Sequence, residues 1–397
     1  MDSSNKLFLL DAYALIYRAY YAFIKNPRIN SKGFNTSAIL GFVNTLEEVL
    51  KKENPTHIGV AFDPAGPTFR HEAFEQYKAQ REETPEAIRL SVPIIKDIIR
   101  AYRIPILEVA GYEADDVIGT LATEAGRQGI TTYMMTPDKD YGQLVSDKVF
   151  MYRPKHTGGF EVMGVEEVKA KFDIQSPAQV IDMLGLMGDS SDNIPGCPGV
   201  GEKTAQKLIS EFGSIENLLE HTDQLKGALK TKVETNREMI TFSKFLATIK
   251  IDVPIQLEMD SLVREEADED SLRSIFEELE FRTLIDRVLK KGVSGNGITS
   301  TPGSKVATGK SAPSPLPLFP EEGGGIQGNL FANFTPNEPD EAKKSNLETL
   351  ESQSRNYQLI DTEEKRREIV QKLLTSKILS LDTETTGTEP MDAELVG

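Results

Sequence analysis

The stretch Leu7-Phe8-Leu9-Leu10-Asp11 is a short apolar run that ends in a carboxylate. The same pattern recurs in Ile58-Gly59-Val60-Ala61-Phe62-Asp63 and in Tyr133-Met134-Met135-Thr136-Pro137-Asp138. Apolar runs of this length are typical of buried strands. The first half of the chain therefore contains several predicted strands, each of which leads directly to an acidic residue.

Helical patterns separate these strands. Apolar residues at 3.6-residue spacing predict helices over 37–52, 85–102 and 114–128, and an apolar run predicts a further strand over 104–109. Alternation of strands and helices is typical of an α/β fold with a mostly parallel sheet flanked by helices. Sites in such folds lie beyond the carboxyl ends of the strands. We therefore expect the strand-end acids to converge.

The composition restricts the class of protein. The chain has 397 residues, enough for two domains or more, and a hydrophobic share of 39%. Its net charge of -17, from 62 acidic and 45 basic residues, argues mildly against a wholly nucleic-acid-binding surface, although bound cations would offset an acidic site. The single cysteine, Cys197, excludes an internal disulfide framework. With no visible signal peptide or apolar run of roughly 18 residues, we expect a cytoplasmic protein without a membrane span.

Acidic clusters accompany the strand ends. The candidate metal ligands are Asp11, Asp63, Glu113, Asp115, Asp116, Asp138, Asp140, Asp189 and Asp192. So many carboxylates share a cleft only if some become neutral or if hard divalent cations hold them together. Any single one of them could be a helix cap or turn residue. The joint pattern instead predicts a nuclease site with two Mg²⁺ ions roughly 4 Å apart, with Mn²⁺ as a substitute.

A glycine-rich segment at 193–205 predicts a helix-hairpin-helix. Gly199 and Gly201 let successive backbone N–H groups face outward as an anion nest, and Lys203 and Thr204 follow them. Such a loop holds backbone phosphates without reading sequence. The alternative is a plain glycine-rich turn between helices.

Basic residues follow the strand that ends at Asp63. Arg70, Lys78 and Arg81 are predicted to share one face of an interrupted helix and to contact DNA phosphates. The alternative is a solvated helical surface, because the same stretch carries acidic residues.

These motifs resemble the 5′ nuclease (flap endonuclease) family, and more narrowly the nuclease region at the start of bacterial DNA polymerases. The resemblance rests on residues 62–72, 111–116, 136–140, 188–196 and 199–205. It implies a PIN-like nuclease domain followed by a helical hairpin subdomain. It also implies that one ion is held by Asp11, Asp63, Glu113 and Asp115, and the second by Asp138, Asp140, Asp189 and Asp192, with Asp116 nearby. Lys78 and Arg81 match the family's basic pair at the base of a helical arch.

The resemblance implies a 5′–3′ exonuclease and flap endonuclease that cleaves DNA or RNA primers near 5′ ends, nicks and flaps, in replication and repair. It also implies a monomer near the nucleoid, and it allows a monovalent cation at the hairpin loop. One rival is a non-catalytic DNA-binding module that keeps the hairpin but not the chemistry. The other is a PIN-like ribonuclease that acts on single-stranded RNA.

The predicted domains are a catalytic α/β domain, a hairpin subdomain, a linker and an incomplete exonuclease domain, at 1–176, 177–291, 292–346 and 347–397. The linker is rich in Gly, Pro, Ser and Thr, which predicts disorder. Residues 381–387 resemble the first motif of a 3′–5′ proofreading exonuclease, with Asp382 and Glu384 after a strand at 377–381. The remaining proofreading motifs and a polymerase domain are absent from this sequence, so neither activity is expected from it.

A short motif lies in the linker. Gln327, Leu330 and Phe331 resemble the peptide with which bacterial replication proteins bind the sliding clamp. The alternative is a chance match within a segment of biased composition.

Overall fold

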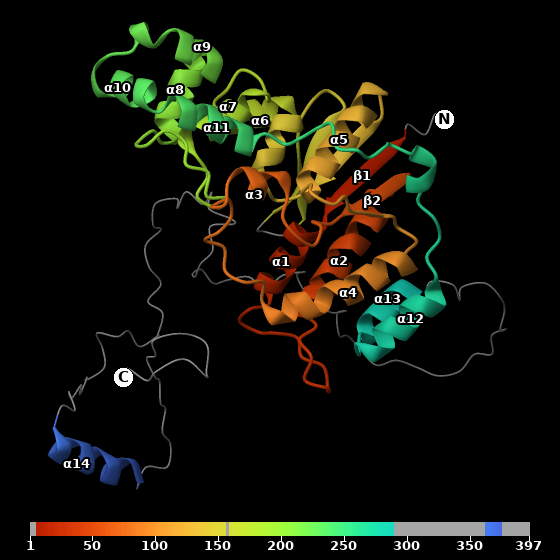
Figure 1. Ribbon diagram of the computed structural model, residues 1–397. Helices are drawn as coiled ribbons and strands as arrows, with labels where there is room; N and C mark the ends of the chain where they lie inside the picture. Colours follow the sequence, from red (N-terminus) through yellow and green to blue (C-terminus); the bar gives the residue numbers. More distant parts are fainter. Residues whose placement is uncertain (1–4, 156–158, 290–361, 375–397) are drawn as a thin grey trace, which may run out of the picture. The chain divides into compact units, whose positions relative to one another are not determined.

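The computed structural model describes residues 5–155, 159–289 and 362–374, and the chain divides into two compact units, 1–334 and 335–397. The first unit contains a six-stranded sheet in the order β3-β2-β1-β4-β5-β6 (Figure 1). The strands are β1 Lys6–Asp11, β2 His57–Ala61, β3 Ile106–Leu107, β4 Thr131–Met135, β5 Val149–Pro154 and β6 Phe160–Met163. β1 to β5 pair in parallel, and β6 is antiparallel to β5. The predicted α/β fold class is confirmed.

Helices cover both faces of this sheet. They are α1 Ala12–Ala22, α2 Ser37–Lys52, α3 Phe69–Ala73, α4 Glu86–Ala101, α5 Ala114–Arg127 and α6 Val165–Phe172. Successive side chains of a strand point to opposite faces. Accordingly, Leu7 and Leu9 of β1 join the core cluster that includes α5, whereas Phe8 and Leu10 join the cluster that includes α2 and α4. The central strand is buried on both faces, which explains why its sequence is continuously apolar.

A helical region follows the sheet. It contains α7 Gln179–Met187, α8 Glu202–Phe212, α9 Ile215–Glu220, α10 Gly227–Thr235 and α11 Arg237–Ala247, with 3-10 turns at Lys139–Leu144, Thr222–Gln224 and Met259–Leu262 elsewhere along the chain. The loop 188–201 joins α7 to α8, so the predicted hairpin lies between two helices. The buried apolar residues of this helical region belong to the same core cluster as those of α5.

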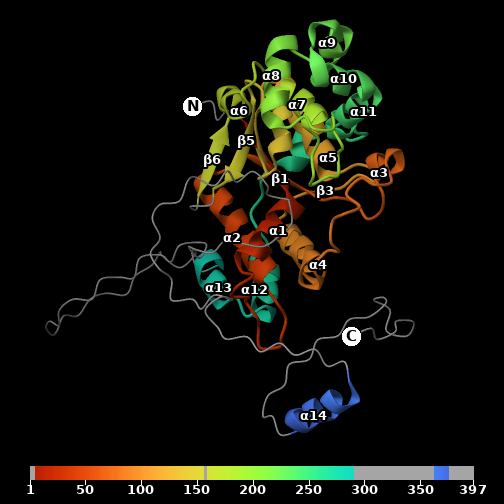
Figure 2. The ribbon, with the colours of Figure 1, turned by 90° about the vertical axis from the view of Figure 1, so that its left-hand side faces the viewer.

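The last helices of this unit leave the helical region. α12 Glu269–Glu278 and α13 Arg282–Leu289 contribute Leu272, Phe276 and Leu284 to the core cluster of α2 and α4. Figures 1 and 2 place α8–α10 at one end of the unit and α12–α13 at the other. The segment predicted as one hairpin subdomain, 177–291, is therefore divided between the two faces of the sheet. The apolar spacing near the end of this segment predicts a helix, but it does not indicate which face of the sheet that helix covers.

The strand predicted at 104–109 is much shorter than expected. β3 contains only Ile106 and Leu107 and forms the sheet edge beside β2. Pro105 has no N–H to donate, although its carbonyl accepts from the N–H of Val60 at 3.0 Å. In contrast, α2, α4 and α5 match the predicted helices to within a residue at each end.

The second unit is described only by α14, Glu363–Leu374, whose residues lie mostly exposed. The predicted linker 292–346, the clamp-like residues Gln327, Leu330 and Phe331, and the carboxylates Asp382 and Glu384 lie outside the described residues. In the part of the chain that the structure describes, no helix combines the length and apolar character that crossing a membrane requires.

Candidate active site

The strand-end carboxylates accept hydrogen bonds from backbone N–H groups at the starts of helices. Asp11 is the last residue of β1, and its Oδ1 accepts from the N–H of Ala14 at 3.1 Å at the start of α1. Asp138 follows β4 and accepts from the N–H of Asp140 at 3.0 Å. Asp63 accepts from the N–H of Ala114, at the start of α5, at 2.7 Å. These hydrogen bonds fix the side chains at the carboxyl ends of the strands. A carboxylate that accepts one such bond still has acceptor capacity for a bound cation.

Three of these carboxylates are electrostatically coupled. Burial and the negative charges of Asp63 and Asp138 raise the pKa of Asp11 to about 7, although the N–H of Ala14 opposes the shift. The pKa of Asp63 is also raised, by partial removal from water and by Glu113. The sheet thus brings together acids that are far apart in sequence, as their positions at strand ends predicted.

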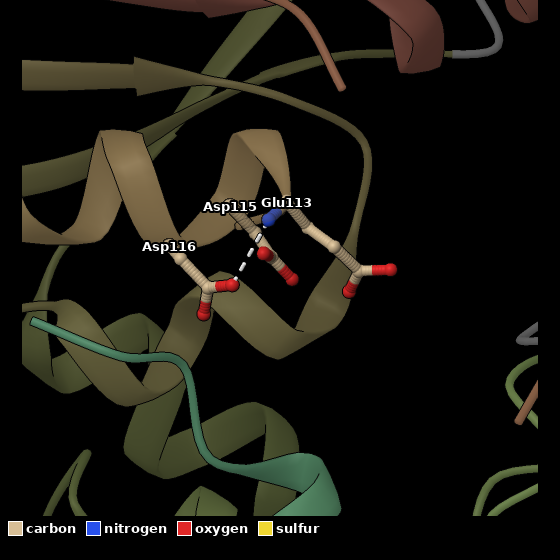
Figure 3. Close-up of side chains that lie close together, drawn as sticks. All are labelled: Glu113, Asp115 and Asp116. Atoms are coloured by element: carbon tan, nitrogen blue, oxygen red, sulfur yellow. Dashed lines mark hydrogen bonds between the residues drawn. The ribbon is translucent and has the colours of Figure 1, made fainter. Parts of the chain in front are cut away.

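A second set of carboxylates stands at the start of α5. Oxygens of Glu113, Asp115 and Asp116 all lie within 4.8 Å of one another. Figure 3 shows the three side chains projecting from the first turn, with Asp116 turned back to the N–H of Glu113. Burial, followed by the negative charge of Asp116, raises the pKa of Asp115 well above its usual range.

Asp116 and Arg70 form a buried pair. Nη1 and Nη2 of Arg70 donate to the two carboxylate oxygens of Asp116, each at 2.8 Å. Arg70 is only 1% exposed, so in this structure it presents no surface for the DNA contact that the sequence predicted. A buried guanidinium needs a carboxylate partner, and Asp116 supplies it. Both oxygens of Asp116 are occupied by Arg70 in this arrangement, although one of them also lies within 4.8 Å of oxygens of Glu113 and Asp115, so its role as a metal ligand stays a prediction.

The remaining acids form a group around the loops after β4 and α7. Asp138, Asp140, Asp189 and Asp192 influence one another's charge here. Burial and the charge of Asp138 raise the pKa of Asp140 well above its usual range, against the opposing charge of Lys139. Lys139 also donates from Nζ to Oδ2 of Asp189. These four acids therefore lie close enough to influence one another, as does Asp138 with Asp11.

Lys78 and Arg81 face the acids. Nζ of Lys78 lies 2.8 Å from Oε1 of Glu113 and 3.7 Å from Oδ2 of Asp192. Nη2 of Arg81 lies 2.6 Å from Oδ1 of Asp192. Although burial raises the pKa of Asp192, these two cations hold it down at about 2. The basic pair thus lies beside both acidic groups.

The backbone around this pair is not helical, contrary to the prediction of an interrupted helix with Arg70 on the same face. α3 ends at Ala73, and Lys78 has φ +57 within a turn. Its backbone N–H donates to the carbonyl of Asp192 at 3.0 Å. A non-glycine residue in this region of φ is uncommon and needs support from the surrounding structure. Here the loop 188–201 supplies that support.

Two tyrosines in the site were not singled out by the sequence. The hydroxyl oxygen of Tyr77 lies 2.9 Å from Oε2 of Glu113 and 3.0 Å from Oδ2 of Asp192, so its single O–H is shared between the two carboxylates. The hydroxyl of Tyr141 donates to Oδ2 of Asp11 at 3.2 Å. Both rings are buried. The position of Tyr77 next to Lys78 was the one available signal, since tyrosines in apolar surroundings otherwise indicate packing.

Unpartnered oxygens show where cations fit. Among the described residues, the buried side-chain polar atoms without a hydrogen-bond partner are Oδ1 of Asp115, Oδ1 of Asp140 and Nε of Arg153. A buried carboxylate oxygen without a partner is costly, and carboxylate oxygens are the ligands that hard divalent cations prefer. One such oxygen lies in each acidic group, so the donor set fits two cations.

The hairpin loop presents open backbone. Gly199 has φ +74, a conformation that favours glycine, and a side chain at Gly201 would meet no atom within 4 Å. Lys203 is exposed on the first turn of α8, and the N–H of Thr204 donates to the carbonyl of Gly201 at 3.0 Å. The carbonyl of Gly199 accepts from Nζ of Lys232 at 3.4 Å. A cationic side chain from α10 therefore already lies at the loop where a monovalent cation was expected.

The loop 188–201 also contacts the basic turn. The side-chain amide of Asn193 donates to the carbonyl of Gln76 at 2.7 Å, and Nε of Arg81 donates to the carbonyl of Ser191 at 3.2 Å. The segment that leads into the predicted phosphate-binding loop is therefore hydrogen-bonded to the turn that carries the basic pair.

Two clusters of carboxylates at the carboxyl ends of parallel strands, with a lysine and an arginine between them, are typical of enzymes that act on phosphate esters. Residues 6–173 match the family described as 5′–3′ exonuclease, N-terminal resolvase-like domain, and residues 175–270 match 5′–3′ exonuclease, C-terminal SAM fold. The chain belongs to this 5′–3′ exonuclease family and is a nuclease.

The relatives identify the kind of exonuclease. The chain is 43% identical to DNA polymerase I of Bacillus subtilis over 291 residues, which cover 72% of this chain and 33% of that protein. It is 36% identical to DNA polymerase I of Chloroflexus aurantiacus over 396 residues, which cover 98% of this chain and 40% of that protein. It thus contains the 5′–3′ exonuclease domain found in DNA polymerase I, and it spans two fifths or less of these relatives' length.

Solved structures show the same fold. A T5 5′-exonuclease with bound zinc gives a TM-score of 0.52 at 21% identity, covering 70% of this chain and 99% of that one. The catalytic core of Rad2 in complex with DNA substrate gives a TM-score of 0.50 at 18% identity, covering 72% of this chain and 93% of that one. The predicted PIN-like nuclease fold with a helical subdomain is confirmed.

Proposed function

We propose that this nuclease hydrolyses phosphodiester bonds in DNA, or in an RNA primer, near 5′ ends, nicks and 5′ flaps, with two Mg²⁺ ions as its cofactor. The observation that carries the proposal is the pair of unpartnered buried oxygens, Oδ1 of Asp115 and Oδ1 of Asp140. Each belongs to one acidic group, and each group contains further carboxylates within electrostatic reach.

The ligand sets follow from this grouping. Asp11, Asp63, Glu113 and Asp115 would hold the first ion, and Asp138, Asp140, Asp189 and Asp192 the second. An all-oxygen donor set suits Mg²⁺, with Mn²⁺ as a substitute. When bound, such ions activate water and stabilise charge on the attacking and leaving oxygens.

The basic pair would act on the scissile phosphate. Lys78 and Arg81 are held by Glu113 and Asp192, so their charged ends already lie where a phosphate next to the acids would bind. The positive charges would orient the phosphate and stabilise the negative charge that develops on its oxygens. Tyr77 would position both partners of Lys78, because its hydroxyl contacts Glu113 and Asp192.

The hairpin would hold the duplex at a distance from the cut. Gly201 offers open backbone and Lys203 a positive charge, and with Gly199 and Thr204 they would hold a phosphate strand without reading its bases. A monovalent cation at this loop remains part of the proposal, and it would share the carbonyl of Gly199 with Lys232. The net charge of -17 is no obstacle, since bound cations would offset part of the charge of the acidic groups.

One experiment separates this function from its rivals. Purified protein is given a 5′-flap duplex or a single-stranded RNA of matched length, in Mg²⁺ or in EDTA. We expect cleavage of the flap near its junction in Mg²⁺ only, and little cleavage of the RNA. Binding without cleavage in Mg²⁺ would indicate a DNA-binding module, and preferential cleavage of the RNA would indicate a PIN-like ribonuclease.

The larger setting is also a proposal. Because the relatives are named DNA polymerase I, we propose that the nuclease works with a DNA polymerase in primer removal and repair, as a cytoplasmic, nucleoid-associated monomer. Binding to a sliding clamp through Gln327, Leu330 and Phe331 remains a prediction from sequence, because these residues lie outside the described part of the chain.

A further inference from the structure

Arg70 uses every donor of its guanidinium in the interior of the protein. Nε donates to the carbonyl of Leu246 at 2.9 Å, and Nη2 donates to the carbonyl of Thr248 at 2.8 Å. Nη1 donates to Glu113 at 3.1 Å, and Nη1 and Nη2 both donate to Asp116. A guanidinium has five N–H groups in a rigid planar fork, and all five are occupied here.

Asp116 is equally occupied. Besides the bidentate pair with Arg70, its Oδ1 accepts from the N–H of Lys250 at 2.8 Å, and its Oδ2 accepts from the N–H of Glu113 at 3.1 Å. The side chain has no exposed surface. Asp116 therefore holds the backbone at both the start of α5 and the segment after α11.

The pair joins three segments that are distant in sequence. Arg70 lies on α3, which follows β2 and Asp63. Asp116 and its neighbours Glu113 and Asp115 open α5. Leu246, Thr248 and Lys250 lie at the end of α11 and just beyond it, in the helical region that contains the hairpin loop. α11 packs against α7, whose end leads into that loop.

We propose that Arg70 and Asp116 are positioning residues that fix the carboxylates at the start of α5 in register with the helical hairpin region. This pair connects the part of the protein that would hold DNA to the part that would cut it. We call Arg70, Asp116 and their hydrogen bonds the buried joint. The inference rests on the proposed function, because it takes Glu113 and Asp115 as ligands of the first ion.

Geometry, rather than charge alone, is what the joint requires. A lysine would preserve the positive charge but could not reach two carboxylates and two carbonyls at once. Loss of one partner also leaves the other charge buried and uncompensated, which destabilises the fold. A test must therefore separate positioning from stability.

The variants are Arg70→Lys, Asp116→Asn, and the double replacement Arg70→Met with Asp116→Leu. Arg100→Lys is the matched control, since Arg100 pairs with Asp97 on the exposed surface of α4. Each protein is measured for its melting temperature, for flap-duplex binding in EDTA, and for amide hydrogen exchange at Glu113 and Lys250. Single-turnover cleavage of the flap is then measured in Mg²⁺.

For Arg70→Lys we expect flap binding close to wild type, faster exchange at both amides, and cleavage slower by about 10- to 100-fold, the range typical of residues that orient ligands. Apolar replacement of a buried ion pair often restores stability. The double variant should therefore regain much of the melting temperature that the single variants lose, while cleavage stays slow.

Two results would overturn the inference. Wild-type cleavage by Arg70→Lys would show that charge is sufficient, and recovery of cleavage together with stability in the double variant would show that the pair is only structural. If the wild type cleaves no flap at all, the proposed function fails. The hydrogen-exchange measurement then still tests whether Arg70 and Asp116 hold the two segments together. Unchanged protection of the Lys250 and Glu113 amides in Arg70→Lys would show that they do not.

Discussion

Nζ of Lys78 lies 2.8 Å from Oε1 of Glu113, although the two residues are 35 positions apart in sequence. The contact joins a turn after α3 to the first turn of α5. Burial would lower the pKa of Lys78, but Asp192, Tyr77 and Glu113 raise it well above its usual range, so the side chain is held as a cation. We propose that a cation fixed between the two acidic groups receives a phosphate of the substrate.

We expect Lys78→Ala and Arg81→Ala to slow the chemical step more than they weaken binding. Both side chains would stabilise charge as it develops on the scissile phosphate, and loss of one such donor typically costs about 100-fold or more in rate. Single-turnover cleavage and the flap dissociation constant give the two quantities. Arg89→Ala, on the exposed surface of α4, is the control. If the dissociation constant changes while the rate does not, the pair are ordinary phosphate contacts.

Asp115→Asn and Asp140→Asn should abolish cleavage but spare flap binding. Each removes charge from a carboxylate that has a buried, unpartnered oxygen, while the hairpin loop and the basic pair remain. The loss should amount to several kcal/mol of transition-state stabilisation. Asp97→Asn, an exposed carboxylate on α4, should behave as wild type. Near-normal turnover by either site variant would refute the metal assignment.

Mg²⁺ should raise the melting temperature of protein stripped with EDTA. Binding to the folded state alone stabilises it, by about 2.7 kcal/mol for each site at a concentration of 100 times the dissociation constant. Differential scanning calorimetry in EDTA and in Mg²⁺ gives the gain. We expect Asp115→Asn and Asp140→Asn each to lose a large part of it. If the melting temperature of the wild type is the same in EDTA and in Mg²⁺, this would argue against a preformed pair of sites.

Lys203→Ala should weaken binding modestly and equally for duplexes of unrelated sequence. We expect the loop that precedes Lys203 to bind phosphates through backbone N–H groups without reading bases, so only phosphate attraction is lost. The slope of log affinity against log salt should become shallower by about one unit or less. Lys52→Ala, at the far end of α2, is the control. Dependence of the effect on duplex sequence would contradict a phosphate role.

A peptide of residues 323–336 should bind a bacterial sliding clamp with micromolar affinity. Leu330 and Phe331 would enter an apolar pocket, and Gln327 would set the register by hydrogen bonds. Calorimetry measures the affinity, which Leu330→Ala with Phe331→Ala should remove. Absence of heat at high micromolar peptide would leave this segment as a plain spacer.

The sheet and its acids could be predicted because both signals are local. A buried parallel strand is apolar throughout, and in Leu7–Leu10 and Ile58–Phe62 the run stops at an aspartate. Parallel pairing then brings the strand ends to one edge, so Asp11, Asp63 and Asp138 had to be neighbours. The glycines at 199 and 201 carried a similar signal for an open loop.

The roles of the charged residues needed the tertiary structure. In sequence, Arg70, Lys78 and Arg81 are three basic residues of one stretch, yet Arg70 is buried against Asp116 while Lys78 and Arg81 face the acidic groups. Asp115 and Asp116 are adjacent, yet one keeps an unpartnered oxygen and the other has none. The sequence by itself determined which acids lie at the carboxyl ends of the strands. Each buried strand is apolar along its length, so the pattern shows where the strand stops. Only the tertiary structure decided which charge is buried in an ion pair and which faces the acidic groups, because the partners of each charge come from segments that are distant in sequence.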